Sequence, residues 1–348
     1  MDKQHVRILL TATGGLAGYS HYHLIGSIQA FQVEVVPADI NNSFNYTAFT
    51  GEALEIIPRG EEEGFIDALL KIVIKKRVNV VFPCSSNELV PLAENRDLFK
   101  RHEVVVAVSH NPIELAVACD KLSALDRAAQ QPVLANFVPR YYPLSNKVDL
   151  YHAVYRLGYP HEKIVFKSRF AQGGRGVIML GQPIKDEWLK SKHGGVMPLE
   201  WLDMLVEEDD IKQFLIMEYL PGKEYSVDVL CYEGKPEIII PRERKVVVDG
   251  KAAVSRLVRH EGLIACVKEL IKLFNLSYIV NIQFKEDKCG QPKLLEINAR
   301  VPGTLAADLA GGINMFEEAL NLIYYGRVKN REVRWDAECA RFFQELYR

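Results

Sequence analysis

The sequence predicts an α/β unit with parallel strands, followed by an α+β region with antiparallel sheets. In the first third of the chain, short apolar runs alternate with amphipathic stretches, which is the pattern of a doubly wound parallel sheet. This alternation ends after Asn111-Pro112. From Lys163 onward, apolar strands follow one another closely with turn residues between them, as in antiparallel hairpins. These three observations divide the chain into two regions of different class.

The first region contains four apolar runs that we interpret as buried parallel strands. They lie at residues 6–10, 32–37, 78–82 and 104–108. Amphipathic segments such as 64–76 separate them and are expected to be helices covering the sheet. We place this domain at residues 1–112.

The second region, at residues 113–330, begins with helical periodicity over 113–130 and a short helix ending near Gly158. Eight strand-like runs follow: IVFKSRF, GVIML, FLIMEYL, YSVDVLCY, PEIIIP, KVVV, YIVNIQF and PKLLEIN. Further helices are expected at 260–274 and after Gly312. We divide this region into subdomains at about 140–222 and about 223–330, and treat 331–348 as a charged C-terminal tail.

Composition restricts the kinds of partner. The chain has 348 residues, and 43 Lys plus Arg against 45 Asp plus Glu give a formal net charge of −2. A chain without a basic field is not expected to bind nucleic acid, and no segment reaches the roughly 20 apolar residues of a membrane helix. The six cysteines are scattered and contain no C-x-x-C pair, which favours reduced thiols and a cytoplasmic location.

The segment KSRFAQGGRGV, which starts at Lys167, has the composition of a phosphate-binding loop. Gly173, Gly174 and Gly176 allow backbone N–H groups to converge on an oxyanion, and Lys167 and Arg175 supply positive charge. The Walker A pattern is absent. An ordinary glycine hairpin turn is the alternative interpretation.

The segment IMEYLPGKEYSVD predicts a strand, a turn and a second strand. Glu218, Tyr219 and Leu220 lie where unpaired backbone groups can meet an adenine edge, and Glu224 can accept two ribose hydroxyls. Strand alternation places Glu224, Ser226 and Asp228 on one face. The alternative is a hairpin with a solvated acidic face.

Two consecutive strands near the end of the second region carry polar side chains in an apolar setting. Asn281 and Gln283 share one face of the first strand, and Glu296 and Asn298 share one face of the second. Mg²⁺ prefers oxygen ligands and usually takes only one or two carboxylates, so these residues fit a magnesium site. Arg300 follows on the same face and can pair with phosphoryl oxygens. A structural hydrogen-bond network is the alternative.

A cationic run provides weaker candidates. Arg242 and Arg244 are followed by Lys245, Arg256 and Arg259. Clustered arginines can hold phosphate or carboxylate in bidentate fashion, although a solvated face would also explain them. From this run, we include Arg242 and Arg244 among the catalytic candidates.

Taken in order, these motifs resemble the ATP-grasp superfamily, and in particular its carbamoyl-phosphate-synthase-like branch of carboxylate-amine ligases. The similarity extends over nearly the whole chain. It rests on this ordered set: Cys119-Asp120-Lys121, Lys167, the loop from Gln172 to Gly176, Glu218-Tyr219-Leu220, Glu224, Gln283, Glu296, Asn298 and Arg300. The resemblance implies a Rossmann-like pre-ATP-grasp domain followed by ATP-grasp domains, with residues 140–222 as a lid.

The resemblance also implies roles for individual residues. Lys121 and Lys167 would contact ATP phosphates beneath the glycine loop. The hinge Glu218-Tyr219-Leu220 would border the adenine, and Glu224 would hold the ribose. Magnesium, or manganese in its place, would be held by Gln283, Glu296 and Asn298, with Arg300 meeting the γ-phosphate. The family often has a second carboxylate where Gln283 stands.

The expected function is therefore an ATP-dependent ligase that forms an acyl phosphate from a small carboxylate and then an amide from a small amine. A homodimer would be an ordinary assembly for such a protein. One alternative is an ATP-binding regulatory protein that does not turn over. Another is a nicotinamide-dependent oxidoreductase, suggested by Gly14, Gly15 and Gly18 after the first strand and by Asp39 after the second, although G-G-x-x-G departs from G-x-G-x-x-G.

The second substrate is expected at the strand ends of the first domain, where ligands bind in open α/β sheets. The residues there are Tyr19, His21, Tyr22, His23, Ser85, Ser86, Asn87 and Glu88. Satisfied structural histidines are the alternative for the two His residues.

Overall fold

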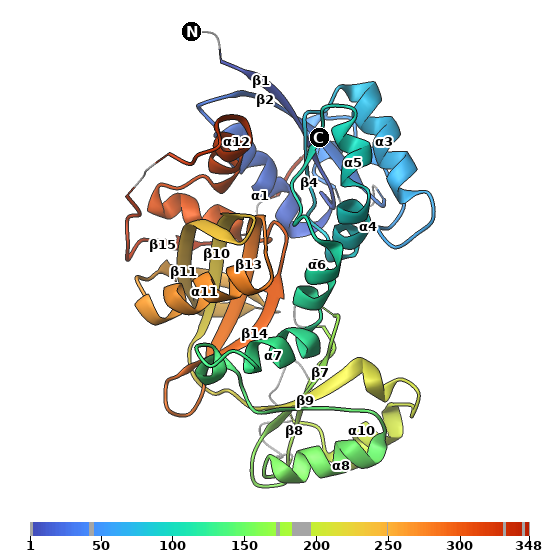
Figure 1. Cartoon of the computed structure of the whole chain (residues 1–348), viewed down its shortest axis with the longest axis vertical. Coiled ribbons are helices and arrows are strands. Elements are labelled where there is room, and N and C mark those ends of the chain that lie inside the picture. The colour runs from blue at the N-terminus through green and yellow to red at the C-terminus, as the bar shows by residue number, and fades with distance from the viewer. Residues whose placement is uncertain are drawn as a thin grey trace.

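The computed structural model describes residues 3–41, 45–171, 175–182, 196–248, 250–329, 332–342 and 345–347. In this part of the chain, the strands form a five-stranded, a four-stranded and a six-stranded sheet. Figure 1 shows the five-stranded and six-stranded sheets side by side, with the four-stranded sheet below them. Helices α6 (Pro112–Cys119) and α7 (Lys121–Ala129) lie between the five-stranded and the four-stranded sheet (Figure 1).

The five-stranded sheet is parallel throughout, as the first region of the sequence predicts. Its order is β3-β2-β1-β4-β5. Central strands of such a sheet are covered on both faces, which explains the unbroken apolar run of Ile8, Leu9 and Leu10, all fully buried. The strands are β1 (His5–Leu10), β2 (Gln32–Asp39), β3 (Glu55–Ile56), β4 (Val80–Phe82) and β5 (Val105–Val106). All four predicted strands are confirmed, and β3 is a fifth strand that the sequence does not predict.

Helices cover this sheet and lead into the second region. The predicted segment 64–76 forms α3, whose apolar side packs on the sheet through Phe65, Leu69 and Val73. The helices of the first region are α1 (Gly15–Gly26), α2 (Thr47–Thr50), α3 (Phe65–Lys76), α4 (Leu89–Glu94) and α5 (Arg96–Lys100).

The single helix expected over 113–130 is wrong, because Asp120 interrupts it. The segment forms α6 (Pro112–Cys119) and α7 (Lys121–Ala129), and Asp120 has an extended backbone between them. Its carboxylate accepts hydrogen bonds from the Leu122 backbone N–H and the Ser123 hydroxyl, and it also pairs with Arg169. Capping by an aspartate side chain offsets the helical hydrogen bonds lost at the break. The interruption places Lys121 at the first position of a new helix.

The four-stranded sheet is antiparallel, with order β6-β9-β7-β8. Its core includes Ile164, Phe166 and Ile216. Helices α8 and α10 lie on it at the bottom of Figure 1. The elements are β6 (Tyr141–Pro143), α8 (Lys147–Arg156), β7 (Ile164–Ser168), β8 (Val177–Leu180), α10 (Leu199–Leu205) and β9 (Phe214–Glu218).

The six-stranded antiparallel sheet has the order β14-β13-β10-β11-β12-β15. Three features differ from expectation. The runs PEIIIP and KVVV form one long strand, β12 has no counterpart among the predicted runs, and the tail supplies β15, which pairs with β12 at the edge of the sheet. The strands are β10 (Glu224–Tyr232), β11 (Lys235–Val248), β12 (Lys251–Leu257), β13 (Tyr278–Glu286), β14 (Pro292–Asn298) and β15 (Glu338–Ala340).

Two amphipathic helices, both predicted, pack against this sheet. Helix α11 (Glu261–Leu273) begins at His260, and α12 (Met315–Tyr325) begins at Asn314, whose side chain accepts from two backbone N–H groups. Apolar clusters pack against both sides of the sheet. One row of polar side chains runs across β10, β13 and β14. No helix in the described part of the chain has both the length and the apolar character that a bilayer crossing needs.

Candidate active site

Strand register brings the predicted polar side chains together. Asn281 lies opposite Asn298, and Gln283 lies opposite Glu296, in the β13–β14 pair. Because side chains that face each other across antiparallel strands point to the same side, all four share one face. Strand β10 extends the row, with Ser226 opposite Gln283.

Hydrogen bonds within this cluster orient the amide groups. The Asn298 side-chain N–H donates to Glu296 Oε1 at 2.9 Å, and the Gln283 N–H donates to Asn281 Oδ1 at 3.4 Å. Asn281 in turn donates to Ser226 Oγ at 2.7 Å and to Asp228 Oδ1 at 2.6 Å. With the N–H groups used in this way, the amide oxygens of Gln283 and Asn298 are the atoms that suit a cation. Asn281 is a positioning residue.

The chemistry of these side chains fits a magnesium ion. One carboxylate and two amides supply neutral and anionic oxygens, and Mg²⁺ takes the remaining positions from water or phosphate. Among the residues the structure describes, no group of three or more His, Cys, Asp or Glu could hold a metal. The set of Gln283, Glu296 and Asn298 has one carboxylate and two amides, so it is not a group of that kind.

Two buried lysines approach this cluster from different elements. Lys121, at the start of α7, has its Nζ 3.5 Å from Glu296 Oε2 and donates to the carbonyl of Ala171 at 2.5 Å. Lys167, on β7, donates from Nζ to the Leu295 carbonyl at 2.9 Å. That carbonyl is available because Leu295 is the extra residue of a bulge, in which Gln283 pairs with Glu296 and Phe284 with Leu294.

Burial and charge shift the titration of this group. Burial lowers the pKa of Lys167 to about 8, although Glu296 acts in the opposite direction. Burial alone would raise the pKa of Glu296, but Lys167, Lys121, the Asn298 hydrogen bond and Arg300 together bring that pKa below its ordinary value. Glu296 is therefore held as a carboxylate, as a metal ligand must be.

A cavity of about 480 Å³ opens on one side of the cluster, and we call it the Met217 cavity. Its volume lies within the range of small-ligand sites. Its polar wall includes Lys167, Glu224 and Glu296. Its apolar wall comprises Val165, Val177, Ile178, Met179, Met197, Met217, Tyr219, Leu220, Val247 and Leu295. A flat aromatic base fits such a wall.

The hinge residues divide between this cavity and the opposite face. Tyr219 and Leu220 line the Met217 cavity, whereas Glu218 does not. The Glu218 carboxylate accepts from the Arg140 backbone N–H at 2.8 Å and pairs with the Arg140 guanidinium at 3.0 Å. Glu224 does line the cavity, where Arg244 donates to it.

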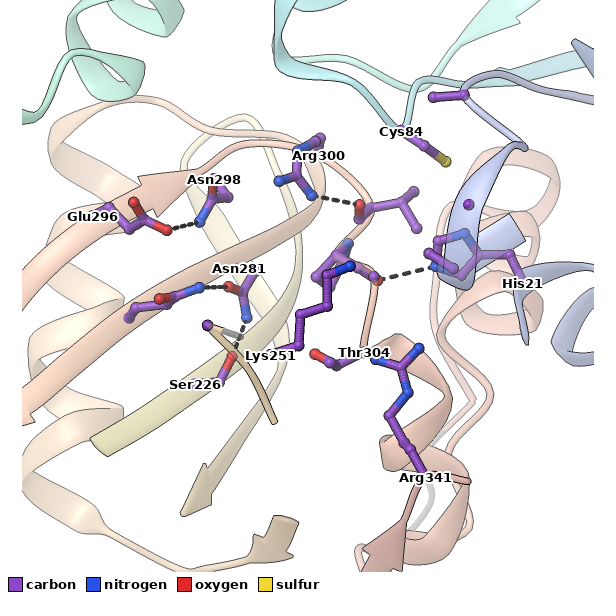
Figure 2. Close-up of a pocket in the computed structure, with 18 of the residues that line it drawn as sticks. His21, Cys84, Ser226, Lys251, Asn281, Glu296, Asn298, Arg300, Thr304 and Arg341 are labelled. Carbon is purple, nitrogen blue, oxygen red and sulfur yellow. Dashed lines mark hydrogen bonds between the residues drawn. The ribbon is translucent and has the colours of Figure 1, made fainter. Parts of the chain in front are cut away.

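A second cavity of about 400 Å³ lies on the other side of the cluster, and we call it the Arg300 cavity (Figure 2). It is bounded by the glycine turn at Gly14 and Gly15, by His21 and Cys84, and by the loop that follows β14. Both cavities share four lining residues: Arg244, Gly250, Gln283 and Glu296. Two of the three candidate metal ligands, Gln283 and Glu296, thus stand at the junction of the two pockets.

Arg300 is fixed at the junction between the first domain and the six-stranded sheet. Its Nε donates to Ser86 Oγ at 3.2 Å, and its Nη1 donates to the Val301 carbonyl at 3.0 Å. Among the residues expected near the second substrate, His21 lines the Arg300 cavity and its Nε2 lies 3.0 Å from the Pro302 carbonyl. Glu88 instead accepts a hydrogen bond from Thr11 at 2.5 Å.

The glycine loop is described only in part. Gly173 and Gly174 lie outside the described residues, whereas Arg175 lines the Arg300 cavity. Gly176 has a φ of +65°, and a Cβ there would meet Ser168 Cβ at 2.8 Å. Glycine at this position is therefore required by the turn itself.

The structure separates the two arginines that the sequence groups together. Arg244 lines both cavities. Arg242 is fully buried, lines neither cavity and pairs with Asp228 and with Asp308, at 3.2 Å for the latter. Its contacts are those of a charge network inside the fold.

Sequence reasoning missed Cys84, Lys251 and Arg341, which also line the Arg300 cavity. Each comes from a different element, and no local pattern relates them to the cluster. The nearby glycine turn also has a structural explanation, because the Gly14 N–H donates to Asp39 at 2.6 Å. Asp39 therefore binds the turn, whereas the oxidoreductase alternative would need it for a ribose.

Comparison with known proteins gives one family model and a set of similar folds. Residues 210–341, which contain the hinge, the cluster and Arg341, match a family model described as ATP-grasp in the biosynthetic pathway with Ter operon. The fold matches an ADP complex of N5-carboxyaminoimidazole ribonucleotide synthetase with a TM-score of 0.65 and 15% identity, over 97% of this chain and 81% of that one. The chain has the ATP-grasp fold.

Other ATP-grasp structures are similar to the same extent. The Staphylococcus aureus N5-carboxyaminoimidazole synthetase with ADP gives a TM-score of 0.68 at 14% identity, over 97% of this chain and 82% of that one. The biotin carboxylase domain of Hydrogenobacter thermophilus 2-oxoglutarate carboxylase, with MgADP and bicarbonate, gives 0.64 at 14% identity, over 95% and 73%. A search of curated protein sequences gives no match. At these identities, the structural likeness establishes the ATP-grasp fold and leaves the substrates open.

Proposed function

We propose that this protein uses Mg-ATP to phosphorylate a carboxylate and then joins the acyl phosphate to an amine, releasing ADP and phosphate. The observation that carries the proposal is the position of Gln283 and Glu296, which line both the Met217 cavity and the Arg300 cavity. A nucleotide in one cavity and an acid in the other would meet at these side chains.

The nucleotide belongs in the Met217 cavity. Its apolar wall suits the adenine, with Tyr219 and Leu220 at the edge of the base. Glu224 would accept the ribose hydroxyls, with Arg244 holding its carboxylate in place. Lys167, which lines the cavity, and Lys121, whose Nζ lies 3.5 Å from Glu296 Oε2, would face the phosphates.

Magnesium would be held by Gln283, Glu296 and Asn298. When bound, Mg²⁺ neutralises phosphate charge and polarises the phosphoryl group that is transferred. The two lysines keep Glu296 ionised, so that the ligand is ready over the ordinary pH range. The mixed amide and carboxylate set limits the negative charge that incoming phosphates must meet.

The acid belongs in the Arg300 cavity, where Arg300 can bind its carboxylate. A carboxylate oxygen attacks the γ-phosphorus, the bond to the β–γ bridging oxygen breaks, and ADP leaves. The amine nitrogen then attacks the acyl carbon, phosphate departs, and the nitrogen gives up a proton. Arg300 and Lys167 stabilise the charge that moves between phosphate and acid. The glycine loop, including Gly173 and Gly174, would cover the phosphates and exclude water.

The direct test is a screen of acid and amine mixtures with Mg-ATP, in which ADP, phosphate and product mass are measured together. Bicarbonate belongs among the acids. The proposal predicts ADP and phosphate in equal amounts with a new amide or carbamate product. Formation of AMP and pyrophosphate would contradict it. ATP binding without ADP release in any mixture would favour a regulatory protein instead.

A further inference from the structure

The Arg300 cavity is lined by more positive charge than one carboxylate substrate requires. Its lining includes a single described acidic side chain, Glu296, against five basic ones. The basic residues are Arg175, Arg244, Lys251, Arg300 and Arg341. A concave site with one dominant sign of charge concentrates ligands of the opposite sign.

Three of these cations are accounted for by the proposed reaction. Arg244 donates to Glu224 and to the Gly250 carbonyl at 2.6 Å, so it belongs to the nucleotide side. Arg300 lies beside Asn298, one of the candidate metal ligands (Figure 2). Arg175 belongs to the glycine loop, which would cover the phosphates in the proposed reaction. The proposed phosphoryl transfer assigns no role to Lys251 or Arg341.

Lys251 and Arg341 are brought to the cavity by neighbouring strands at the sheet edge. Lys251 begins β12, and Arg341 follows β15, which pairs with β12. The Arg341 backbone N–H donates to the Ala253 carbonyl at 2.8 Å, so the hydrogen bonds between β12 and β15 extend as far as Arg341. The pairing therefore holds the Arg341 backbone in place at the cavity edge.

The two ends of the cavity are separate. In Figure 2, Arg300 lies next to Asn298, whereas Arg341 lies on the far side of Thr304. A cavity of about 400 Å³ accommodates a molecule of several carbons between them, which is more than bicarbonate alone would fill.

We propose that the molecule in the Arg300 cavity carries two anionic groups. One is the carboxylate that is phosphorylated beside Glu296 and Arg300. The other is a second carboxylate or a phosphate, which is bound by Arg341 together with Lys251. This inference rests on the proposed function, since that function places the reacting acid in this cavity.

Binding of matched probes tests the proposal without turnover. Butanoate and succinate have four carbons each and differ by one carboxylate, and serine and phosphoserine differ by one phosphate. Each is titrated calorimetrically into the whole protein saturated with Mg-ADP. In at least one pair, the probe with two anionic groups should bind about tenfold or more tightly than the probe with one. The pair that shows the difference identifies the second group as carboxylate or phosphate. Equal affinity within both pairs would overturn the inference.

Variants locate the effect at Arg341. Arg341→Gln should remove most of the preference for the dianionic probe, and Arg341→Lys should restore part of it. Arg256→Gln is the matched control, because Arg256 lies on β12 and pairs with Asp336 outside the cavity. A thermal melt of each variant shows whether it is folded. A preference that survives in folded Arg341→Gln, or that disappears equally in Arg256→Gln, would refute the assignment.

These outcomes are distinguishable from failure of the proposed function. If Mg-ADP binds and the probe pairs behave as predicted but no acid and amine mixture releases ADP, the ligase proposal fails and the dianion site stands. If ADP is released with monoanionic and dianionic acids at the same KM, the ligase proposal stands and the dianion site fails.

Discussion

The affinity for nucleotide should depend on pH through Lys167. Burial lowers its pKa to about 8 in the free protein, and a bound phosphate would raise that pKa by stabilising the ammonium form. With a pKa near 8, roughly 90% of the side chains are protonated at pH 7 and roughly 10% at pH 9. If the bound form stays protonated, ADP affinity should fall about tenfold over that range, or about 1.4 kcal/mol.

The assay is a calorimetric titration of ADP with excess Mg²⁺ at pH 7, 8 and 9. Lys167→Met removes the titrating group at nearly constant side-chain length, so its affinity should be lower at pH 7 and nearly flat with pH. Lys163→Met, at an exposed position just before β7, should keep the wild-type slope. A wild-type affinity that does not change, or the same decline in Lys167→Met, would refute the reasoning.

Three further predictions concern stability. Burial lowers the pKa of His21 from 6.5 to about 4, so the unfolded chain takes up a proton at a higher pH than the folded protein does. The free energy of unfolding should therefore drop by up to about 3 kcal/mol between pH 7 and pH 4. Urea titrations at these two pH values should show a smaller drop in His21→Gln. Asp120→Ala removes a helix cap and an ion pair and should cost about 2 kcal/mol in the same urea titrations at pH 7; an unchanged midpoint would contradict this role. Arg242→Met leaves two buried carboxylates without their cation and should lower the free energy of unfolding by about 3–5 kcal/mol. Arg244→Met should weaken ADP binding with a smaller loss of stability. The reverse ranking would assign catalysis to Arg242.

The cluster was predictable because it depends on local alternation. Period-2 spacing alone puts Asn281 with Gln283 and Glu296 with Asn298, and two adjacent strands joined by a short turn pair in antiparallel fashion. The same rule explains Glu218. It alternates with Met217, whose side chain lines the cavity, so the Glu218 side chain faces the other side of β9 and meets Arg140.

Other features could not be predicted, because they depend on contacts between distant segments. Arg341 reaches the Arg300 cavity only because β15 pairs with β12, more than 80 residues earlier in the chain. The break at Asp120 depends partly on Arg169, which lies on another element. Helical periodicity continues through Asp120, so the sequence pattern does not show the interruption. Arg242 and Arg244 look equivalent in sequence, and they are distinguished by their contacts, which are Asp228 and Asp308 for Arg242 and Glu224 for Arg244.

The central claim is that Gln283, Glu296 and Asn298 form a magnesium site between two substrate cavities. The most direct test is the affinity for ADP measured with and without Mg²⁺ in the wild-type protein and in Glu296→Gln, which is close to isosteric. The wild-type protein should bind ADP at least about tenfold more tightly with Mg²⁺, and folded Glu296→Gln should lose that difference. A Glu296→Gln protein that keeps the full magnesium effect would contradict the account.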